Sequence, residues 1–219
     1  NFIFYVRKLF GGINFHNKNV LDIGSGNGIF SIYCSMSGAK TVVSLEPETE
    51  GSSDKMIETS LTLKNKFKCE NVNFVNKKFE YYNNDLKFDV VLLHNTINHL
   101  DENATISLKN NETSQQKYID ILKFLRDKLN DDAEIIITDC SRYNFFGDLN
   151  IKNPFAPQIE WEKHNSPYLW KEMLTKAKFN SISVEWVNHN SLRSTGLLIF
   201  GNRFMSYLLN SYFLIKCKK

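Results

Sequence analysis

A glycine-rich segment near the start of the chain has the residue types of a cofactor-binding loop. Residues 22–28 read D-I-G-S-G-N-G and directly follow a short apolar run. Glycine lets a backbone approach a ligand closely, and a helix that begins after the loop presents its N–H groups to that ligand. Nicotinamide-binding loops follow the spacing G-x-G-x-x-G, whereas Gly24, Gly26 and Gly28 follow G-x-G-x-G, with Asp22 two places before the first glycine. The spacing therefore disfavours a dehydrogenase.

Polar residues that can meet this loop follow two later apolar runs. Glu46 and Pro47 end the run 41–45, about twenty residues beyond the loop, where a carboxylate can accept hydrogen bonds from both hydroxyls of a ribose. His94 and Asn95 follow the run 88–93. Open parallel sheets bind ligands beyond the carboxyl ends of their strands, at the point where the strand order reverses. We therefore expect these residues to surround one cofactor.

The elements that would position these residues alternate between strands and helices. Apolar and β-branched runs predict strands over 20–23, 41–45, 72–75, 88–93, 133–138, 182–187 and 212–216. Apolar residues at helical spacing predict helices over 29–36, 54–67, 118–129 and 167–178. This alternation predicts an α/β fold with a doubly wound, mostly parallel seven-stranded sheet and helices on both faces. We expect one domain over 1–219, with a lid insertion at 141–166 after the fifth strand and a mostly helical insertion at 191–210 before the last.

Several of these motifs occur in the order found in class I methyltransferases. They are the glycine loop with its preceding acid, Glu46, the strand F-D-V-V at 88–91 and the polar segment H-N-T-I-N-H-L at 94–100. From residue 19 to 139 the chain resembles this seven-stranded, Rossmann-like family, and the likeness continues weakly to the end. The resemblance implies S-adenosylmethionine as the cofactor, bound by Asp22, Gly24, Ser25, Gly26, Glu46, Pro47, Phe79, His94 and Asn95. Two alternatives stay open: Asp22 either contacts the cofactor or orients the loop, and Phe79 either packs on the adenine or faces the core.

Candidates for acceptor binding and catalysis lie after the fourth and fifth strands. His99 follows the fourth strand, and Asp139 ends the fifth, where it either approaches the acceptor or caps the next turn. In the lid, Glu160, Trp161 and His164 either shape an acceptor pocket or form a solvated loop with one anchored Trp. We assign His99, His164 and Asp139 to catalysis, and Glu160 and Trp161 to the substrate. The two histidines of the segment 94–100 have no third ligand, so no metal is expected.

The bulk composition disfavours several partners. A formal net charge of +3 over 219 residues, carried mostly by Lys, gives no concentrated basic stripe, so no nucleic acid is expected. Four widely spaced cysteines without a C-x-x-C pair favour neither a zinc ribbon nor a disulfide framework, and fit a reducing, cytoplasmic location. The apolar stretch 197–215 is interrupted by Asn202, Arg203 and Asn210, so no transmembrane segment is expected.

These features predict S-adenosylmethionine-dependent transfer of a methyl group to the oxygen or nitrogen of a small-molecule acceptor. A hydroxyl acceptor needs a base such as His99 or His164 to remove its proton, whereas a neutral amine needs only proximity. One alternative is a protein that binds the cofactor but is catalytically silent, as a regulatory or partner subunit. The other is a membrane-surface methyltransferase for a lipid or quinone, suggested by the apolar residues Leu197, Leu198, Ile199, Phe200, Met205, Leu208 and Leu209.

Overall fold

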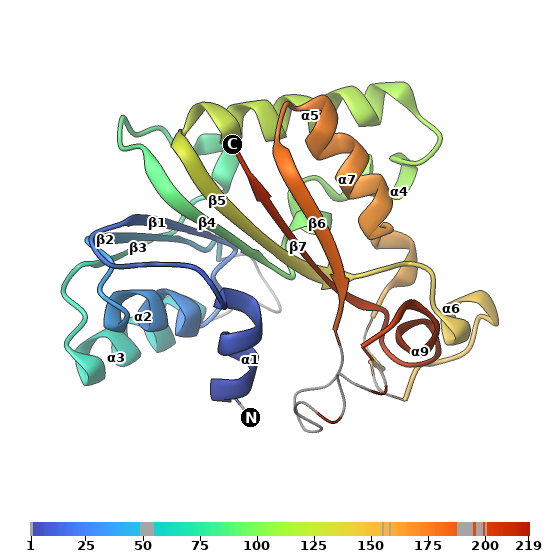
Figure 1. Cartoon of the computed structure of the whole chain (residues 1–219), viewed down its shortest axis with the longest axis horizontal. Helices are drawn as coiled ribbons and strands as arrows, with labels where there is room; N and C mark the ends of the chain where they lie inside the picture. The colour runs from blue at the N-terminus through green and yellow to red at the C-terminus, as the bar shows by residue number, and fades with distance from the viewer. Residues whose placement is uncertain are drawn as a thin grey trace.

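A seven-stranded sheet forms the centre of the molecule in the computed structural model, which describes residues 2–48, 55–154, 156–157, 159–187, 195, 199 and 201–219 (Figure 1). The strands are β1 (Asn19–Ile23), β2 (Thr41–Leu45), β3 (Val72–Val75), β4 (Phe88–His94), β5 (Leu129–Cys140), β6 (Asn180–Trp186) and β7 (Tyr212–Lys218). Their order is β3-β2-β1-β4-β5-β7-β6, and only β7 runs antiparallel to its neighbours. The predicted doubly wound, mostly parallel α/β fold is confirmed.

Helices cover both faces of this sheet. One face carries α1 (Phe2–Phe10), α2 (Ile29–Met36) and α3 (Met56–Phe67), and the other carries α4 (Glu102–Ser107), α5 (Glu112–Asp127) and α7 (Pro167–Lys176) (Figure 1). The buried apolar side chains form two clusters accordingly, because neighbouring residues of a strand point to opposite faces. Val42 belongs to the same cluster as Phe30, on the side of α1 and α2, whereas Val43 belongs to the cluster that contains Tyr118 and Trp170, on the side of α5 and α7.

The strand order reverses between β1 and β4, and this places three strand ends at one edge. Ile23 at the end of β1 is paired with Leu45 of β2 on one side and with Leu93 of β4 on the other. The glycine loop, Glu46 and His94 each follow one of these strand ends. The topology therefore brings three of the sequence motifs to a single edge of the sheet.

After β5 the chain leaves the sheet and forms short helices. α6 (Phe145–Asp148) and a 3-10 helix (Trp161–Lys163) lie within 141–166, and α9 (Arg203–Leu208) precedes β7. Two other 3-10 helices span Phe79–Tyr81 and Ile97–His99. Of the predicted insertion 191–210, residues 191–194, 196–198 and 200 lie outside the described residues. Across the described ranges, none of the helices is long and apolar enough to cross a bilayer.

Local details differ from the sequence predictions. β5 begins at Leu129 and not at the predicted residue 133. The prediction began too late because residues 130–132 are polar and lack a strand pattern, and Asp132 has a left-handed φ of 62°. α2 buries Phe30 and Cys34, whereas Ile29 and Met36, which were expected on one apolar face, are exposed. The helix α1 has no counterpart among the helices predicted from the sequence. The start expected for α3, near Asp54, lies outside the described residues, and the helix begins at Met56.

Gly28→Ala is expected to lower the free energy of unfolding more than Gly26→Ala. Both glycines have left-handed φ values, +73° and +54°, which cost an L side chain roughly 1 kcal/mol. A Cβ at residue 28 would also stand 2.6 Å from the Phe74 ring, whereas one at residue 26 would enter open space. Urea unfolding should show a loss of about 1 kcal/mol for Gly26→Ala and about 2–4 kcal/mol for Gly28→Ala. Equal losses would contradict the packing of residue 28 on Phe74.

Candidate active site

The loop after β1 is held between the end of β2 and the segment after β4. Gly24 and Gly26 have φ values of 67° and 54°, in the left-handed region that favours glycine. The N–H groups of Gly24 and Ser25 both donate to Leu45 O, at 2.8 and 3.0 Å. On the other side, Gly24 packs so closely on Thr96 that a Cβ would collide with it. The loop therefore has little freedom to move as a whole.

Asp22 lies beneath the loop and is fully buried. Its Oδ2 accepts a hydrogen bond from Ser31 Oγ at 2.6 Å, while its Oδ1 has no hydrogen-bond partner among the described residues. Burial raises the pKa of Asp22 to about 7; the Ser31 hydrogen bond opposes this shift, and the Glu46 carboxylate adds to it. A cation beside the loop would favour the ionised form. The carboxyl group is therefore suited to a positively charged ligand.

Glu46 supports the loop from the end of β2. Its Oε2 accepts a hydrogen bond from Gly26 N at 2.7 Å. Burial raises the pKa of Glu46, and the Gly26 hydrogen bond opposes this shift. With Oε2 engaged by the loop, Oε1 is the oxygen that can meet a ribose hydroxyl. Pro47 follows directly at the strand end.

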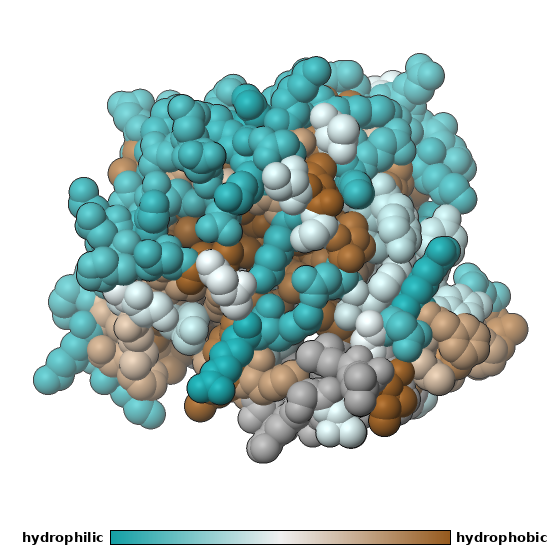
Figure 2. Space-filling model, in the orientation of Figure 1, coloured by the Kyte–Doolittle hydropathy of each residue, from teal (hydrophilic) through white to brown (hydrophobic). Residues whose placement is uncertain are grey.

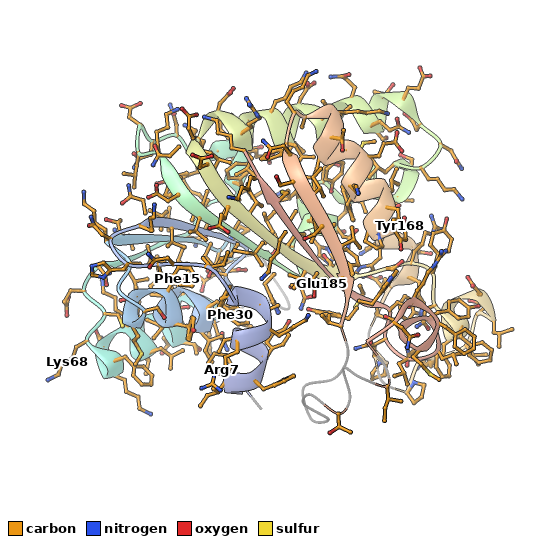
Figure 3. All side chains as sticks on the ribbon, viewed as in Figure 1. Arg7, Phe15, Phe30, Lys68, Tyr168 and Glu185 are labelled. Atoms are coloured by element: carbon orange, nitrogen blue, oxygen red, sulfur yellow. The ribbon has the colours of Figure 1, made fainter. Side chains whose placement is uncertain are left out.

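A cavity of about 460 Å³ lies between the loop, α1, α2 and the end of β4. Three apolar residues, Phe2, Ile29 and Phe30, form part of its wall. Phe30 lies on the side of the sheet that carries α1 (Figure 3). Six of the predicted cofactor residues also line it: Asp22, Gly24, Ser25, Gly26, His94 and Asn95.

His94 at the end of β4 joins this first cavity to α1. Its Nε2 lies 2.8 Å from Tyr5 Oη, and its ring centre lies 4.6 Å from that of Phe30. Burial lowers the pKa of His94 to about 4, so the imidazole is neutral at pH 7. His94 therefore adds no positive charge to the cavity.

A second cavity, of about 340 Å³, lies beyond the end of β5. Asn95 lines both cavities, has a left-handed φ of 54°, and accepts a hydrogen bond from the hydroxyl of Tyr212. The three residues predicted to be catalytic all line the second cavity, together with Ala156, Pro157 and Ile159 of the segment 141–166. The structure thus brings His99, Asp139 and His164 together, on the far side of Asn95 from the glycine loop.

His164 and Asp139 form a buried pair. His164 Nδ1 lies 3.2 Å from Asp139 Oδ1 and 3.1 Å from Asn98 Nδ2. The Asn98 amide is oriented by its own Oδ1, which accepts from Asn165 N at 3.0 Å. Nδ1 cannot donate to Asp139 and accept from Asn98 at once. Because Asn98 Nδ2 can only donate, the hydrogen bond to Asn98 needs a lone pair on Nδ1, whereas pairing with the Asp139 carboxylate needs a proton there.

His99 faces His164 across the second cavity, with ring centres 5.8 Å apart and ring planes at 89°. Its Nδ1 lies 2.9 Å from Glu102 Oε1. Lys163 then joins Glu102 to Glu160, with Nζ at 3.2 and 2.7 Å from their carboxylates. Glu160 is therefore engaged by Lys163, and the residues that line the cavity do not include it.

Trp161 and Phe79 have packing roles in the structure. A Cβ on Gly147 would stand 2.9 Å from the Trp161 ring, so the indole covers α6 and does not line the second cavity. Phe79 is buried in the core, with its ring centre 5.2 Å from that of Phe124. Of the two roles weighed for Phe79, the structure shows the core contact, because other side chains already cover the ring.

Sequence reasoning missed Tyr212, which lines the second cavity, and two residues that contact the lining histidines: Asn98 beside His164 and Tyr5 beside His94. Asn98 lies inside the polar segment 94–100, so its position was a usable signal. Tyr5 lies on α1, where apolar residues at helical spacing were a weak signal. Tyr212 reaches the site because β7 runs antiparallel to β5 and sets Tyr212 opposite Cys140. A single sequence holds no signal for that pairing.

A mostly parallel seven-stranded sheet with a glycine loop after β1 and a carboxylate after β2 defines the class I methyltransferases. A family model described as a methyltransferase domain matches residues 2–183, and the chain belongs to this family. It is an S-adenosylmethionine-dependent methyltransferase. No curated protein matches the chain by sequence.

Solved structures share this fold at low sequence identity. An S-adenosylmethionine-dependent methyltransferase from Aquifex aeolicus is 18% identical with a TM-score of 0.63, covering 98% of this chain and 87% of its own. One from Archaeoglobus fulgidus is 17% identical with a TM-score of 0.62, covering 100% and 93%. One from Mesorhizobium loti is 11% identical with a TM-score of 0.65, covering 98% and 96%. At these identities the likeness shows the fold.

The residues around the first cavity fit the cofactor. S-adenosylmethionine supplies a methyl group activated by a positively charged sulfur. Asp22, with one buried oxygen that lacks a partner among the described residues, would compensate positive charge. Glu46 is not among the residues that line the cavity, but it is bonded to Gly26 of the lining and would accept from the ribose. The open space at the missing Cβ of Gly26 lets the cofactor approach the backbone. These side-chain roles remain predictions.

Glu46→Ala is expected to weaken S-adenosylmethionine binding at least about tenfold, because hydrogen bonds to a charged carboxylate are lost. Calorimetry on Glu48→Ala supplies the matched control, since Glu48 accepts from Ile57 N on the exposed surface. Glu46→Gln retains an oxygen for Gly26 N but lacks the charge. Full affinity in Glu46→Gln with loss in Glu46→Ala would limit Glu46 to holding the loop.

The affinity for S-adenosylmethionine is expected to rise as the pH increases from 5.5 to 7.5. Asp22 is protonated below its pKa of about 7, and its ionised form attracts the cationic cofactor. Asp22→Asn should bind more weakly and reduce the slope of affinity against pH, measured by calorimetry across this range. An unchanged slope in the Asn variant would show that another group titrates.

Proposed function

We propose that the protein transfers the methyl group of S-adenosylmethionine to an oxygen or nitrogen of a small molecule held in the second cavity. The observation that carries this proposal is the position of Asn95, which lines both cavities. Transfer from the first cavity to the second would therefore take place beside Asn95. The acceptor in the second cavity would be surrounded by His99, Asp139 and His164, which all line it. A volume of about 340 Å³ is at the small end of the range for ligand pockets, which favours a small acceptor.

His164 is the general base in this proposal when the acceptor is a hydroxyl. In this proposal the reacting tautomer carries its proton on Nδ1, which lies 3.2 Å from Asp139 Oδ1, so that Nε2 can take the proton of the acceptor. The acceptor oxygen bonds to the methyl carbon as the carbon–sulfur bond breaks, and the electron pair of that bond stays on sulfur. The protonated His164 is then stabilised by the Asp139 carboxylate. A neutral amine acceptor needs no base, and the same residues position it.

The segment 141–166 acts as a lid over the acceptor in this proposal, within a single domain over 1–219. Ala156, Pro157 and Ile159 support this role, because they form one wall of the second cavity. Glu160 and Trp161 influence selectivity indirectly: Glu160 is tied to Lys163, and Trp161 packs on α6, so both hold Ile159 in position.

Two alternative functions have less support from the residues of the two cavities. A catalytically silent protein would not need a buried Asp139–His164 pair that faces a cavity next to the cofactor. The lipid or quinone alternative was suggested by seven apolar residues, of which Leu197, Leu198 and Phe200 lie outside the described residues. Ile199 is exposed, whereas Met205, Leu208 and Leu209 are half-buried.

His164→Ala is expected to lower kcat at least about a hundredfold on a hydroxyl acceptor, because the base is lost. The affinity for S-adenosylmethionine should stay nearly unchanged, since His164 lies outside the first cavity. Asp139→Asn should also lower kcat, because the amide no longer favours Nδ1–H. The assay is a screen of hydroxyl and amine acceptors with labelled cofactor, followed by kinetics on any acceptor found.

His16→Ala is the matched control, because His16 is exposed and lines neither cavity. It should retain full turnover. Full turnover of His164→Ala on the same acceptor would reduce His164 to a structural residue. Failure of every acceptor, with intact cofactor binding, would favour the catalytically silent alternative.

A further inference from the structure

We propose that the surface formed by α6, α9 and the segment 149–152 docks onto an anionic lipid bilayer. We name this surface the α6–α9 platform; its exposed apolar members are Tyr143, Phe145, Leu149, Ile151, Ile199 and Phe204. The proposal concerns a partner surface, and it goes beyond the reaction and the acceptor proposed above.

Large apolar side chains are exposed together on this platform. Leu149 is 55% exposed, Ile151 is 50% exposed and Phe204 is 66% exposed. Figure 2 shows apolar residues gathered at the end of the molecule where Figure 1 places α6. Tyr168 of α7, also exposed, extends the platform and lies above α9 in Figure 3. Single exposed apolar residues are ordinary, but a contiguous group of them marks an interaction surface.

Buried asparagines make the platform rigid. Asn144 Nδ2 donates to Tyr207 O and Leu209 O of the α9 region, at 3.0 and 2.9 Å. Asn153 Nδ2 also donates to Leu209 O, at 2.6 Å. On the surface, Tyr207 Oη donates to Asp148 Oδ2 at 2.9 Å. These bonds join α6, the segment after it and α9 into one unit that holds the exposed apolar side chains in place.

Cations lie directly against the aromatic rings of the platform. Lys109 Nζ donates to Tyr143 Oη at 3.0 Å and lies 5.7 Å from the ring centre. The Arg203 guanidinium lies 5.6 Å from the ring centre of Tyr168. Lys152 is exposed beside Ile151. Aromatic rings bordered by Lys and Arg suit the boundary between lipid tails and anionic headgroups.

The charge of the platform distinguishes a bilayer from a second copy of the chain. Over 143–152 and 199–209 the sequence has two basic residues, Lys152 and Arg203, and one acidic residue, Asp148. The Asp148 carboxylate already accepts from Tyr207. A second copy docked through the same surface would bring these cations towards each other, whereas anionic headgroups would neutralise them.

Docking would also bring the second cavity towards the bilayer. Ile151 of the platform and the wall residues Ala156 and Pro157 belong to the same stretch of chain. The first half of the segment proposed as the lid is therefore part of the platform, and its second half lines the second cavity.

The test is cosedimentation of the full chain with vesicles of phosphatidylcholine alone or mixed with phosphatidylglycerol. The protein should bind the mixed vesicles and bind less as salt is added. The double variant Leu149→Asp with Phe204→Asp should bind at least about tenfold more weakly, because two apolar groups become charged. Leu61→Asp with Phe67→Asp is the matched control: both residues are similarly exposed, carry the same charge change, and lie on α3 at the opposite end (Figure 1).

A second pair of variants tests the cations. The loss of each cation should weaken binding to the mixed vesicles roughly fivefold. The double variant Lys152→Glu with Arg203→Glu should therefore bind more than about tenfold more weakly. Lys40→Glu with Lys66→Glu, on exposed residues away from the platform, should have a smaller effect. All variants should retain S-adenosylmethionine binding by calorimetry, which shows that they are folded.

Three results would overturn the proposal: no binding to mixed vesicles at low salt, equal binding to both vesicle types, or an equal loss in platform and control variants. A dimer that Leu149→Asp dissociates, with no vesicle binding, would assign the platform to a second copy. None of these measurements depends on methyl transfer, so their failure leaves the proposed function standing.

Discussion

The turn at the end of β1 is the constraint on which the rest of the site depends. Leu45 O accepts from two successive N–H groups of the loop, and Glu46 accepts from a third. Thr96 closes on Gly24 from the segment after β4, in a space that a Cβ would fill. Three neighbouring strands are thereby locked together at their carboxyl ends. Since Asn95 directly precedes Thr96, the same packing decides where the two cavities meet.

Burial disfavours the charged forms of Asp22 and His94, which line the first cavity. Asp22 has a raised pKa and His94 a lowered one, and in both cases burial is the main cause because it penalises the charged form. Ser31 donates to Asp22 Oδ2, and Tyr5 and His94 are hydrogen-bonded to each other, without neutralising a charge. A positively charged ligand would restore the ionised carboxylate and would not be repelled by the histidine. The cavity therefore selects for charge as well as for shape.

The second cavity is assembled from segments far apart in the sequence. Asp139 is the second-last residue of β5, His164 lies near the end of the segment 141–166, and Tyr212 begins β7, which runs antiparallel between β5 and β6. Behind His164, the buried amide of Asn98 accepts from Asn165 N, so the two sides of the cavity are joined through side chains as well as through the sheet. The proposed chemistry and the proposed lid both depend on this late antiparallel strand.

The sequence by itself determined the sheet, the glycine loop and the strand ends that carry Glu46 and His94. These features are local: periodicity identifies the strands, glycine spacing identifies the loop, and the topology rule for parallel sheets places them at one edge. Only the tertiary structure decided that Tyr5 meets His94, that Tyr212 meets Asn95, and which face of α2 is buried. It also placed Phe79 in the core and the His164 ring against Asp139. Such pairs depend on the packing of distant segments, and the local pattern of a single sequence does not encode which segments meet.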